Sequence, residues 1–209
     1  MSRSQNPMTG HMCGSMANFN TYVRYGENII SSKAFNKRNA NTVSQIAQRA
    51  SFKLITKAYH SFGGVPRTSF PCRNQAFTPL VAFIDANLPE AIVKTGAVPV
   101  IDYSKMLVSK GNLPLVEVPT AVVGTAGITL SYKSDHEIPD VSATDEVTAV
   151  AKLKSGALLV ARQVRGTQEL GLILLTYSGI NANDVECCYL FVLNEDGSNA
   201  SDSTYVVVG

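Results

Sequence analysis

The stretch that decides the fold is residues 146–176, which read EVTAVAKLKSGALLVARQVRGTQELGLILLT. Apolar and β-branched side chains alternate with others in three short runs, at 146–153, 157–164 and 169–176. The turn-forming pairs Ser155-Gly156 and Arg165-Gly166 separate the runs. Because successive side chains of a strand point to opposite faces, a period of two residues predicts three antiparallel strands here.

The same pattern continues on both sides of this stretch. Further strands are predicted at 98–108, 115–123, 127–133, 185–193 and 203–208, with turn-formers at 124–127, 178–179 and 196–197. Short strands at this spacing are typical of an immunoglobulin-like antiparallel β-sandwich, which we place over residues 113–209. In the strand 185–193, Cys187 and Cys188 are neighbours, so we expect one in the core and the other facing out, both as reduced thiols.

Upstream of the sandwich the apolar period is that of a helix. Thr42-Val-Ser-Gln45 is a capping box, and apolar residues then recur every three or four positions up to Gly63-Gly64. This spacing predicts a helix over 42–62 that buries Ile46, Ala50, Leu54 and Phe62. A second helix is expected within 74–87, and a short third one within 88–96, where proline comes early and glycine ends the segment.

The first residues show a different pattern. Residues 18–34 are predicted to form a β-hairpin that turns at Gly26-Glu27-Asn28, and residues 1–17 have no periodicity. The predicted fold class is therefore α+β, with an N-terminal β-hairpin and helical hairpin followed by the sandwich. The predicted divisions are an extended arm over 1–17, a basic hairpin plus helical region over 18–112, and the sandwich over 113–209.

Charge is distributed unevenly along the 209 residues, although the formal net charge is only +2. Residues 1–75 carry ten basic side chains and one acidic one, a net charge of +9, whereas residues 76–209 carry eight basic and 15 acidic ones, a net charge of −7. The basic half suits either nucleic acid or an acidic protein surface, including that of a second copy. The predicted partner-binding residues are basic side chains of this half: Arg24, Lys33, Lys37, Arg38, Arg49, Lys53 and Lys57.

Motifs for catalysis are missing from the sequence. It contains no GxGxxG, no Walker loop, no GxSxG and no HExxH, and none of His11, His60 and His136 has a second ligand at metal spacing. We therefore expect neither an enzyme nor a cofactor. Two acidic loops leave calcium binding open: one contains Asp135, Glu137, Asp140, Asp145 and Glu146, and the other is the turn over 194–199.

Segments that would direct the chain to a membrane are also missing. No run of 18 apolar residues occurs, and residues 1–10 lack the apolar core of a secretory signal. We expect a protein that stays in the cytoplasm or leaves it by assembly or lysis.

Three segments carry a resemblance to a known family: Asn41-Thr-Val-Ser-Gln-Ile-Ala-Gln-Arg49 with Phe52, residues 101–114, and the ending Asp202-Ser-Thr-Tyr-Val-Val-Val-Gly209. They resemble, collinearly over nearly the whole chain, an uncharacterised bacterial family of unknown function whose members also occur in genomes of tailed phages and prophages. The glycine-rich opening of that family is matched by Gly10 and Gly14, whereas Ala17 and Ser31 depart from it. The resemblance implies no catalytic residues.

From these observations we expect a non-enzymatic structural or assembly component of a tailed-phage virion, of the ring, collar, tail or head-decoration kind. Its partners would be other copies of the chain and other virion proteins, and it would reach the virion after synthesis in the host cytoplasm. The alternative is a bacterial cytoplasmic module that binds nucleic acid through the basic N-terminal face.

Overall fold

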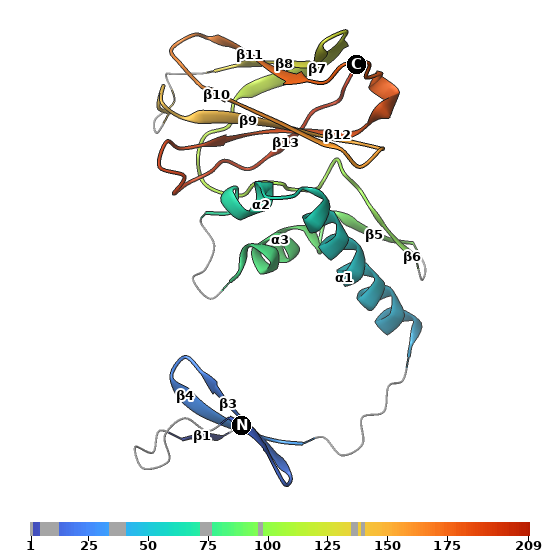
Figure 1. The fold of residues 1–209 in the computed structure, drawn as a ribbon, viewed down its shortest axis with the longest axis vertical. Helices are drawn as coiled ribbons and strands as arrows, with labels where there is room; N and C mark the ends of the chain where they lie inside the picture. The colour runs from blue at the N-terminus through green and yellow to red at the C-terminus, as the bar shows by residue number, and fades with distance from the viewer. Residues whose placement is uncertain are drawn as a thin grey trace. The chain divides into compact units, whose positions relative to one another are not determined.

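A computed structural model describes residues 2–4, 13–33, 41–71, 77–95, 98–134, 138 and 141–209 (Figure 1). The chain forms two compact units, Met1–Asn41 and Thr42–Gly209. The helical region and the sandwich belong to the same unit, so the change from helices to strands that was placed near residue 112 falls inside it.

The N-terminal unit is an antiparallel sheet of four strands in the order β1-β4-β3-β2. Its strands are β1 (Ser2–Ser4), β2 (Gly14–Met16), β3 (Phe19–Arg24) and β4 (Glu27–Ser32). The predicted hairpin is β3–β4, but its turn lies at Tyr25-Gly26, where φ is 55° and 78°, and not over 26–28. Positive φ at both central residues is the geometry of a two-residue hairpin turn that matches the twist of the strands.

Part of the segment predicted as an extended arm is paired as strand. β1 pairs with β4, where Arg3 lies opposite Ile29, and β2 pairs with β3, where Gly14 lies opposite Thr21. These residues are strands because their backbone pairs with the hairpin, and side-chain periodicity alone did not indicate this.

Helix α1 (Val43–Ser61) begins as the capping box predicts. The Gln45 amide donates to Thr42 Oγ1 at 3.3 Å, and the Thr42 amide donates to Gln45 Oε1 at 3.4 Å. At its end, the chain leaves the helix through Gly63, whose φ is +59°.

Phe62 is fully buried, as predicted, but the rest of the buried face of α1 differs by one position from the predicted one. Ile46 is 45% exposed, and Ala50 and Leu54 are only half-buried. The face that packs on the core consists of Ala47, Ser51, Ile55, Ala58, Tyr59 and Phe62. Ser51 tolerates full burial because its hydroxyl donates to the Ala47 carbonyl at 2.8 Å, a satisfied bond that an apolar pattern does not reveal.

Two short elements follow α1: α2 (Val65–Thr68) and α3 (Pro79–Asn87), the latter capped by the Thr78 side chain. The side chain of the fully buried Asn87 makes two hydrogen bonds to Leu107. Its Nδ2 donates to the Leu107 carbonyl at 2.8 Å, and its Oδ1 accepts from the Leu107 backbone amide at 2.6 Å. This pair of bonds ties α3 to the segment that leads into the sandwich.

The prediction of a short helix within 88–96 is wrong. A turn over 88–91 leads into β5 (Ile92–Thr95), which pairs with β6 (Val98–Ile101) as an antiparallel hairpin packed beside α1 (Figure 1). The β-branched Ile92 and Val93 suit extended backbone, and here this preference outweighs the helix-like placing of proline and glycine. The strand predicted over 98–108 accordingly ends at Ile101.

In the described residues from 113 on, seven strands make the sandwich, and most begin and end within two residues of the prediction. They are β7 (Glu117–Gly124), β8 (Gly127–Lys133), β9 (Glu146–Leu153), β10 (Leu158–Val164), β11 (Leu170–Thr176), β12 (Val185–Leu193) and β13 (Thr204–Tyr205), with a 3-10 turn η1 (Ala182–Asp184) before β12. The sheets have the orders β11-β8-β7 and β10-β9-β12-β13. Strands β7, β8 and β11 thus form one sheet, and β9, β10, β12 and β13 form the other. This is an immunoglobulin-like arrangement in which the fourth strand, β10, pairs with the third, β9. The α+β class with a β-sandwich is confirmed.

The helical region covers the second face of the sheet that holds β9 and β12. Tyr189 and Phe191 of β12 pack with Ile55, Phe62 and Phe83 in one core, while Leu190 and Val192 pack against β8 and β11 in the other. Three layers result: a three-stranded sheet, a four-stranded sheet and the helices.

This layering corrects the expectation for the two cysteines. Cys187 and Cys188 do point to opposite faces of β12, but neither faces solvent, because each face has a core of its own. Burial raises the pKa of each thiol to about 12, so both remain protonated and unreactive at neutral pH.

Among the described residues, no helix is both long enough and apolar enough to span a membrane.

Candidate functional site

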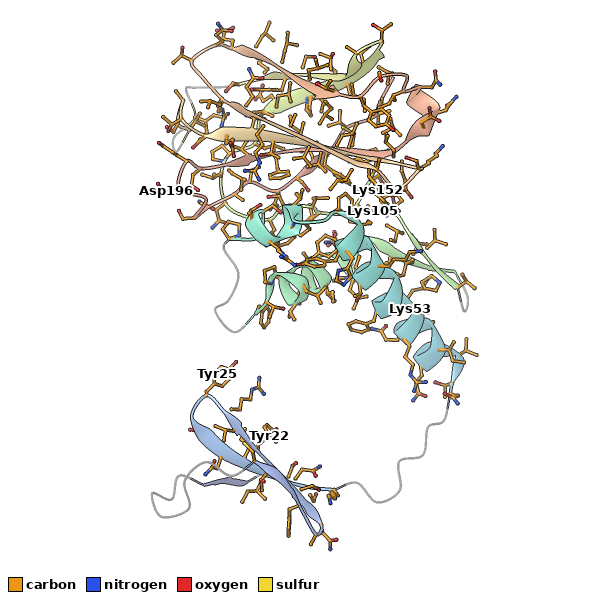
Figure 2. The ribbon with its side chains drawn as sticks, in the orientation of Figure 1. Tyr22, Tyr25, Lys53, Lys105, Lys152 and Asp196 are labelled. Atoms are coloured by element: carbon orange, nitrogen blue, oxygen red, sulfur yellow. The ribbon has the colours of Figure 1, made fainter. Side chains whose placement is uncertain are left out.

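Three of the seven predicted partner-binding residues share one face of α1. Arg49, Lys53 and Lys57 are four residues apart, so each lies about one turn from the next, and all three are exposed. Figure 2 labels the middle one, Lys53. The β5–β6 hairpin, which contacts α1, carries Lys94, whose ammonium donates to Gln48 Oε1 at 3.0 Å. We call Arg49, Lys53 and Lys57 the α1 basic ladder.

Two more predicted residues lie in the N-terminal unit. The Arg24 guanidinium is 5.3 Å from the ring centre of Tyr25, and Lys33 donates to the Ala17 carbonyl at 2.7 Å. Lys33 therefore helps to close the β2–β3 turn. Lys37 and Arg38 lie outside the described residues, so the structure groups only the α1 basic ladder.

Exposed apolar side chains also occur on α1 and on β6, which contacts α1. Phe52 is 43% exposed between two members of the ladder, and Val98 and Val100 on β6 are 72% and 59% exposed. A surface of basic and apolar residues together can bind a partner by charge and by area.

A charged cluster that the sequence did not indicate lies where the helices meet the sandwich (Figure 2). The Lys152 ammonium on β9 is 2.7 Å from Glu186 Oε2 on β12, and the Tyr103 hydroxyl donates to Glu186 Oε1 at 2.8 Å. The Lys152 ammonium also lies 5.5 Å from the ring centre of Tyr103 and 6.0 Å from that of Phe62. In the sequence, Lys152 is a charged residue inside a largely apolar strand, but the strand pattern does not indicate which residue it pairs with.

The cluster has shifted acidities that follow from its contacts. Burial raises the pKa of Tyr103 well above its usual range, and the carboxylate of Glu186 raises it further. For Glu186, burial acts to raise the pKa, but the hydrogen bonds from Lys152 and Tyr103 outweigh it and leave the pKa lowered. At neutral pH the cluster is thus an ion pair with a neutral phenol, which joins the layers and offers no base or nucleophile.

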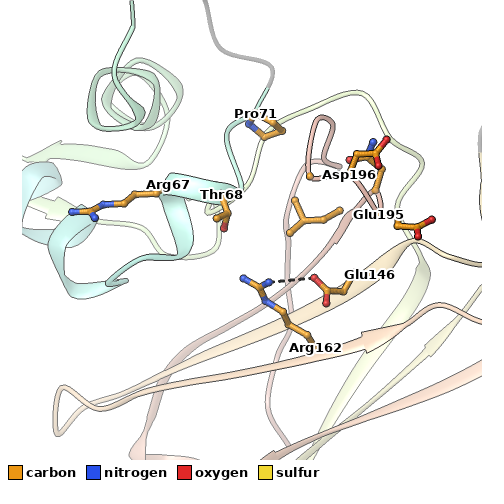
Figure 3. Close-up of a pocket in the computed structure, with 10 residues that line it drawn as sticks. Arg67, Thr68, Pro71, Glu146, Arg162, Glu195 and Asp196 are labelled. Carbon is orange, nitrogen blue, oxygen red and sulfur yellow. Dashed lines mark hydrogen bonds and ion pairs between the residues drawn. The ribbon is translucent and has the colours of Figure 1, made fainter.

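A surface hollow of about 430 Å³ lies between α2 and the end of the four-stranded sheet (Figure 3). Arg162 NH1 is 3.3 Å from Glu146 Oε2 at its floor, whereas Arg67 points away from that pair. Glu195 and Asp196 of the predicted acidic turn also line the hollow. The described lining holds no histidine or cysteine, and its charges of both signs define no ligand chemistry.

The loops considered for calcium are occupied by internal bonds as far as they are described. Asp145 is buried and accepts from the Ser142 amide at 3.0 Å, and Asn194 accepts from the Asn199 amide at 2.8 Å to close its turn. Asp135, Glu137 and Asp140 lie outside the described residues, as do His11 and His136. Within the described part of the chain, no three histidine, cysteine or acidic side chains are grouped to hold a metal ion.

The fold and its surfaces define a class of protein: an α+β molecule in which an immunoglobulin-like sandwich carries a helical layer, preceded by a small separate sheet. More particularly, the chain belongs to a family of unknown function, DUF6266, whose sequence profile matches residues 11–207. No curated protein sequence matches the chain.

Proposed function

We propose that the chain is a non-enzymatic structural component of a tailed-phage virion, of the ring, collar, tail or head-decoration kind, that acts through protein–protein contacts. The observation that supports this proposal most is the composition of the N-terminal unit. Of its described residues, only Ile29 is a buried hydrophobic residue, and Thr21 and Asn28 are buried polar ones.

The same unit exposes aromatic side chains along its hairpin. Phe19 is 51% exposed, Tyr22 is 37% exposed and Tyr25, at the turn, is 75% exposed (Figure 2). Units of about 40 residues rarely bury enough apolar surface to be stable unaided, and the described part of this one has a single buried apolar side chain. A binding surface on another protein would supply the missing burial, as in docking modules of assemblies.

The place in a virion rests on the resemblance to a family that also occurs in phages and prophages. Synthesis in the host cytoplasm followed by incorporation into the particle is the corresponding route. The partners proposed are further copies of this chain and other virion proteins.

The proposal is tested by removing the N-terminal unit. Light scattering after size exclusion should give a larger assembly for the full chain, alone or with neighbouring virion proteins, than for the variant that begins at Thr42. The shortened chain should keep its far-ultraviolet circular dichroism, because the second unit has its own core. A monomeric full chain in the presence of those proteins, or its absence from particles purified on a density gradient, would refute the proposal.

The α1 basic ladder supports a second candidate, nucleic-acid binding by a cytoplasmic module. Replacing Arg49, Lys53 and Lys57 with glutamine should weaken binding to duplex DNA and flatten its dependence on salt, because fewer phosphates would be neutralised. The matched control replaces Lys110, Lys133 and Lys154 with glutamine; these three are also exposed and lie outside α1. If both triple variants bind DNA equally, the ladder is not a nucleic-acid site.

A further inference from the structure

Three of the four edges of the sandwich are protected against pairing with another strand. Residues 208–209 run beside β7, where the Gly209 amide donates to the Ala121 carbonyl at 3.1 Å. β13 is only two residues long. β10 carries Arg162, which is paired with Glu146. Covering segments, short edge strands and charges are the devices by which natural sheets avoid uncontrolled pairing.

The fourth edge, β11, has none of these devices. Its seven residues read LGLILLT, without charge or proline, and it pairs with β8 along its whole length without a bulge. Among the described strands, β8 is the one that β11 pairs with, so alternate amides and carbonyls of β11 point away from the sheet.

Leucines follow the outer face of this unprotected edge. Leu170, Leu172 and Leu174 are 71%, 62% and 46% exposed, while Ile173 and Leu175 point into the core. Beside the start of β11 the surface is hollowed by about 530 Å³ between the residues 163–168 and the strand itself. An uncharged strand edge without a bulge and with exposed leucines is open to pairing with another strand.

We propose that β11 pairs antiparallel with β11 of a second copy of this chain, so that the two three-stranded sheets join into one six-stranded sheet. The proposal rests on the proposed function in that it names one homotypic contact of the assembly. A twofold axis through Ile173 pairs all seven residues and sets Leu172 of each copy opposite Leu174 of the other. Cross-strand contacts between such leucines stabilise a sheet.

For two copies that pair through β11, the surrounding charges favour the antiparallel direction. Glu169 and Lys133 lie at the N-terminal end of the strand, whereas residues 176–179 at the other end and 124–127 beside them are uncharged. The antiparallel pairing places the charged end of each copy next to the uncharged end of the other. A parallel pairing would set Glu169 beside Glu169, which costs free energy through repulsion between like charges.

The test uses the full chain and a readout local to β11. Hydrogen exchange of a peptide that contains residues 170–176 is measured across protein concentration, with sedimentation velocity on the same samples. At a total concentration ten times the dimer dissociation constant, about one fifth of the chains remain monomeric, so outward amides should exchange about fivefold more slowly than in dilute protein.

Three variants separate edge pairing from other contacts. Leu172→Lys should abolish the concentration dependence, whereas Val122→Lys should keep it, because Val122 is 61% exposed on the same outer face but lies two strands from the edge. Leu172→Lys combined with Leu174→Glu should restore it, since each new lysine then faces a new glutamate of the second copy. Circular dichroism verifies that each variant is folded.

Exchange at β11 that does not depend on concentration would overturn the proposal, and so would a loss with Val122→Lys as large as with Leu172→Lys. Failure of the double variant to restore protection would overturn the antiparallel pairing. Removing residues 1–41 deletes the N-terminal unit and leaves β11 in place. A failure of the β11 pairing and a failure of the proposed function are therefore seen in different measurements.

Discussion

The two units of this chain are built from the same kind of antiparallel pairing but differ in what their sheets bury. The hairpin β3–β4 keeps an unbroken register from Phe19–Ser32 to Arg24–Glu27, as regular as that of β8 with β11. Nevertheless, the described residues of the first unit bury one hydrophobic side chain, whereas β12 of the second unit is buried on both faces. Regular hydrogen bonding therefore shapes a sheet, and stacking against another layer stabilises it.

The largest effect expected from this difference is at the join between the helices and the sandwich. Phe62 is fully buried, and its ring lies 5.9 Å from that of Tyr189. Phe62→Ala should lower the free energy of unfolding by roughly 3–5 kcal/mol, through lost transfer energy and a cavity. Urea denaturation should show helix and sandwich signals falling in one transition. Separate transitions would show that the two layers are not one unit.

The matched change in the first unit is Ile29→Ala. It should speed hydrogen exchange in residues 13–33 and leave the denaturation midpoint of the second unit unchanged, because the two units have separate sets of internal contacts. A large shift of that midpoint would show that the units stabilise each other.

A second test concerns which face of α1 belongs to the second unit's core. Ile55 is fully buried and Ile46 is 45% exposed. Ile55→Ala should cost about 2–5 kcal/mol, whereas Ile46→Ala should change stability by less than about 0.5 kcal/mol, as is usual at the surface. Equal losses in thermal or urea denaturation would place the buried face of α1 where the apolar spacing alone put it.

A third, smaller effect is expected at the ion pair between β9 and β12. Glu186→Gln leaves Lys152 without its anion and should cost on the order of 1–3 kcal/mol at neutral pH. Because the folded-state pKa of Glu186 lies below its ordinary value near 4.5, this stabilisation is present above that value and is lost as pH falls through the folded pKa. The difference between variant and original should thus shrink as the pH falls below 4.5.

The control for that test is Glu195→Gln, at an exposed turn position. Denaturation at pH 7 and at pH 3.5 measures both variants. A loss for Glu186→Gln that does not change with pH would mean that the carboxylate charge is not what stabilises the join.

The smallest effect concerns a buried hydroxyl. Among the described side chains, the Tyr132 hydroxyl is buried without a hydrogen-bond partner, whereas the Tyr189 hydroxyl donates to the Tyr103 carbonyl at 2.7 Å. Tyr132→Phe should be neutral or stabilise the fold by up to about 1 kcal/mol, and Tyr189→Phe should cost about 0.5–1.5 kcal/mol. A clear loss of thermal stability for Tyr132→Phe would indicate a partner for that hydroxyl.

Gly171 marks a related limit of what strand periodicity reveals. A Cβ at this position would lie 2.1 Å from Tyr132 Cζ, so the glycine in β11 makes room for the tyrosine ring on β8. The glycine is visible in the sequence, but the neighbour that requires it becomes known only when β8 and β11 are paired.

The candidate site, like the fold, was predicted only in part from the sequence. Helical spacing is enough to place Arg49, Lys53 and Lys57 on one side of a helix, and the structure shows all three exposed. The sequence pattern could not indicate that Lys33 donates a hydrogen bond to the Ala17 carbonyl, or that Lys152 and Glu186 form an ion pair between two strands. These contacts depend on turn geometry and on strand register.

The sequence by itself determined the local structure: the capping box that begins α1, the turns, and the alternation that marks the strands of the sandwich. These are set by backbone geometry and by neighbours within a few residues, so they need no knowledge of the rest of the chain. Only the tertiary structure decided which faces are buried. Cys187 and Cys188 are both enclosed because a helical layer covers the second face of the sheet. Ser51 is buried where apolar spacing predicted Ala50, because contacts with the rest of the unit determine which face of α1 packs on the core.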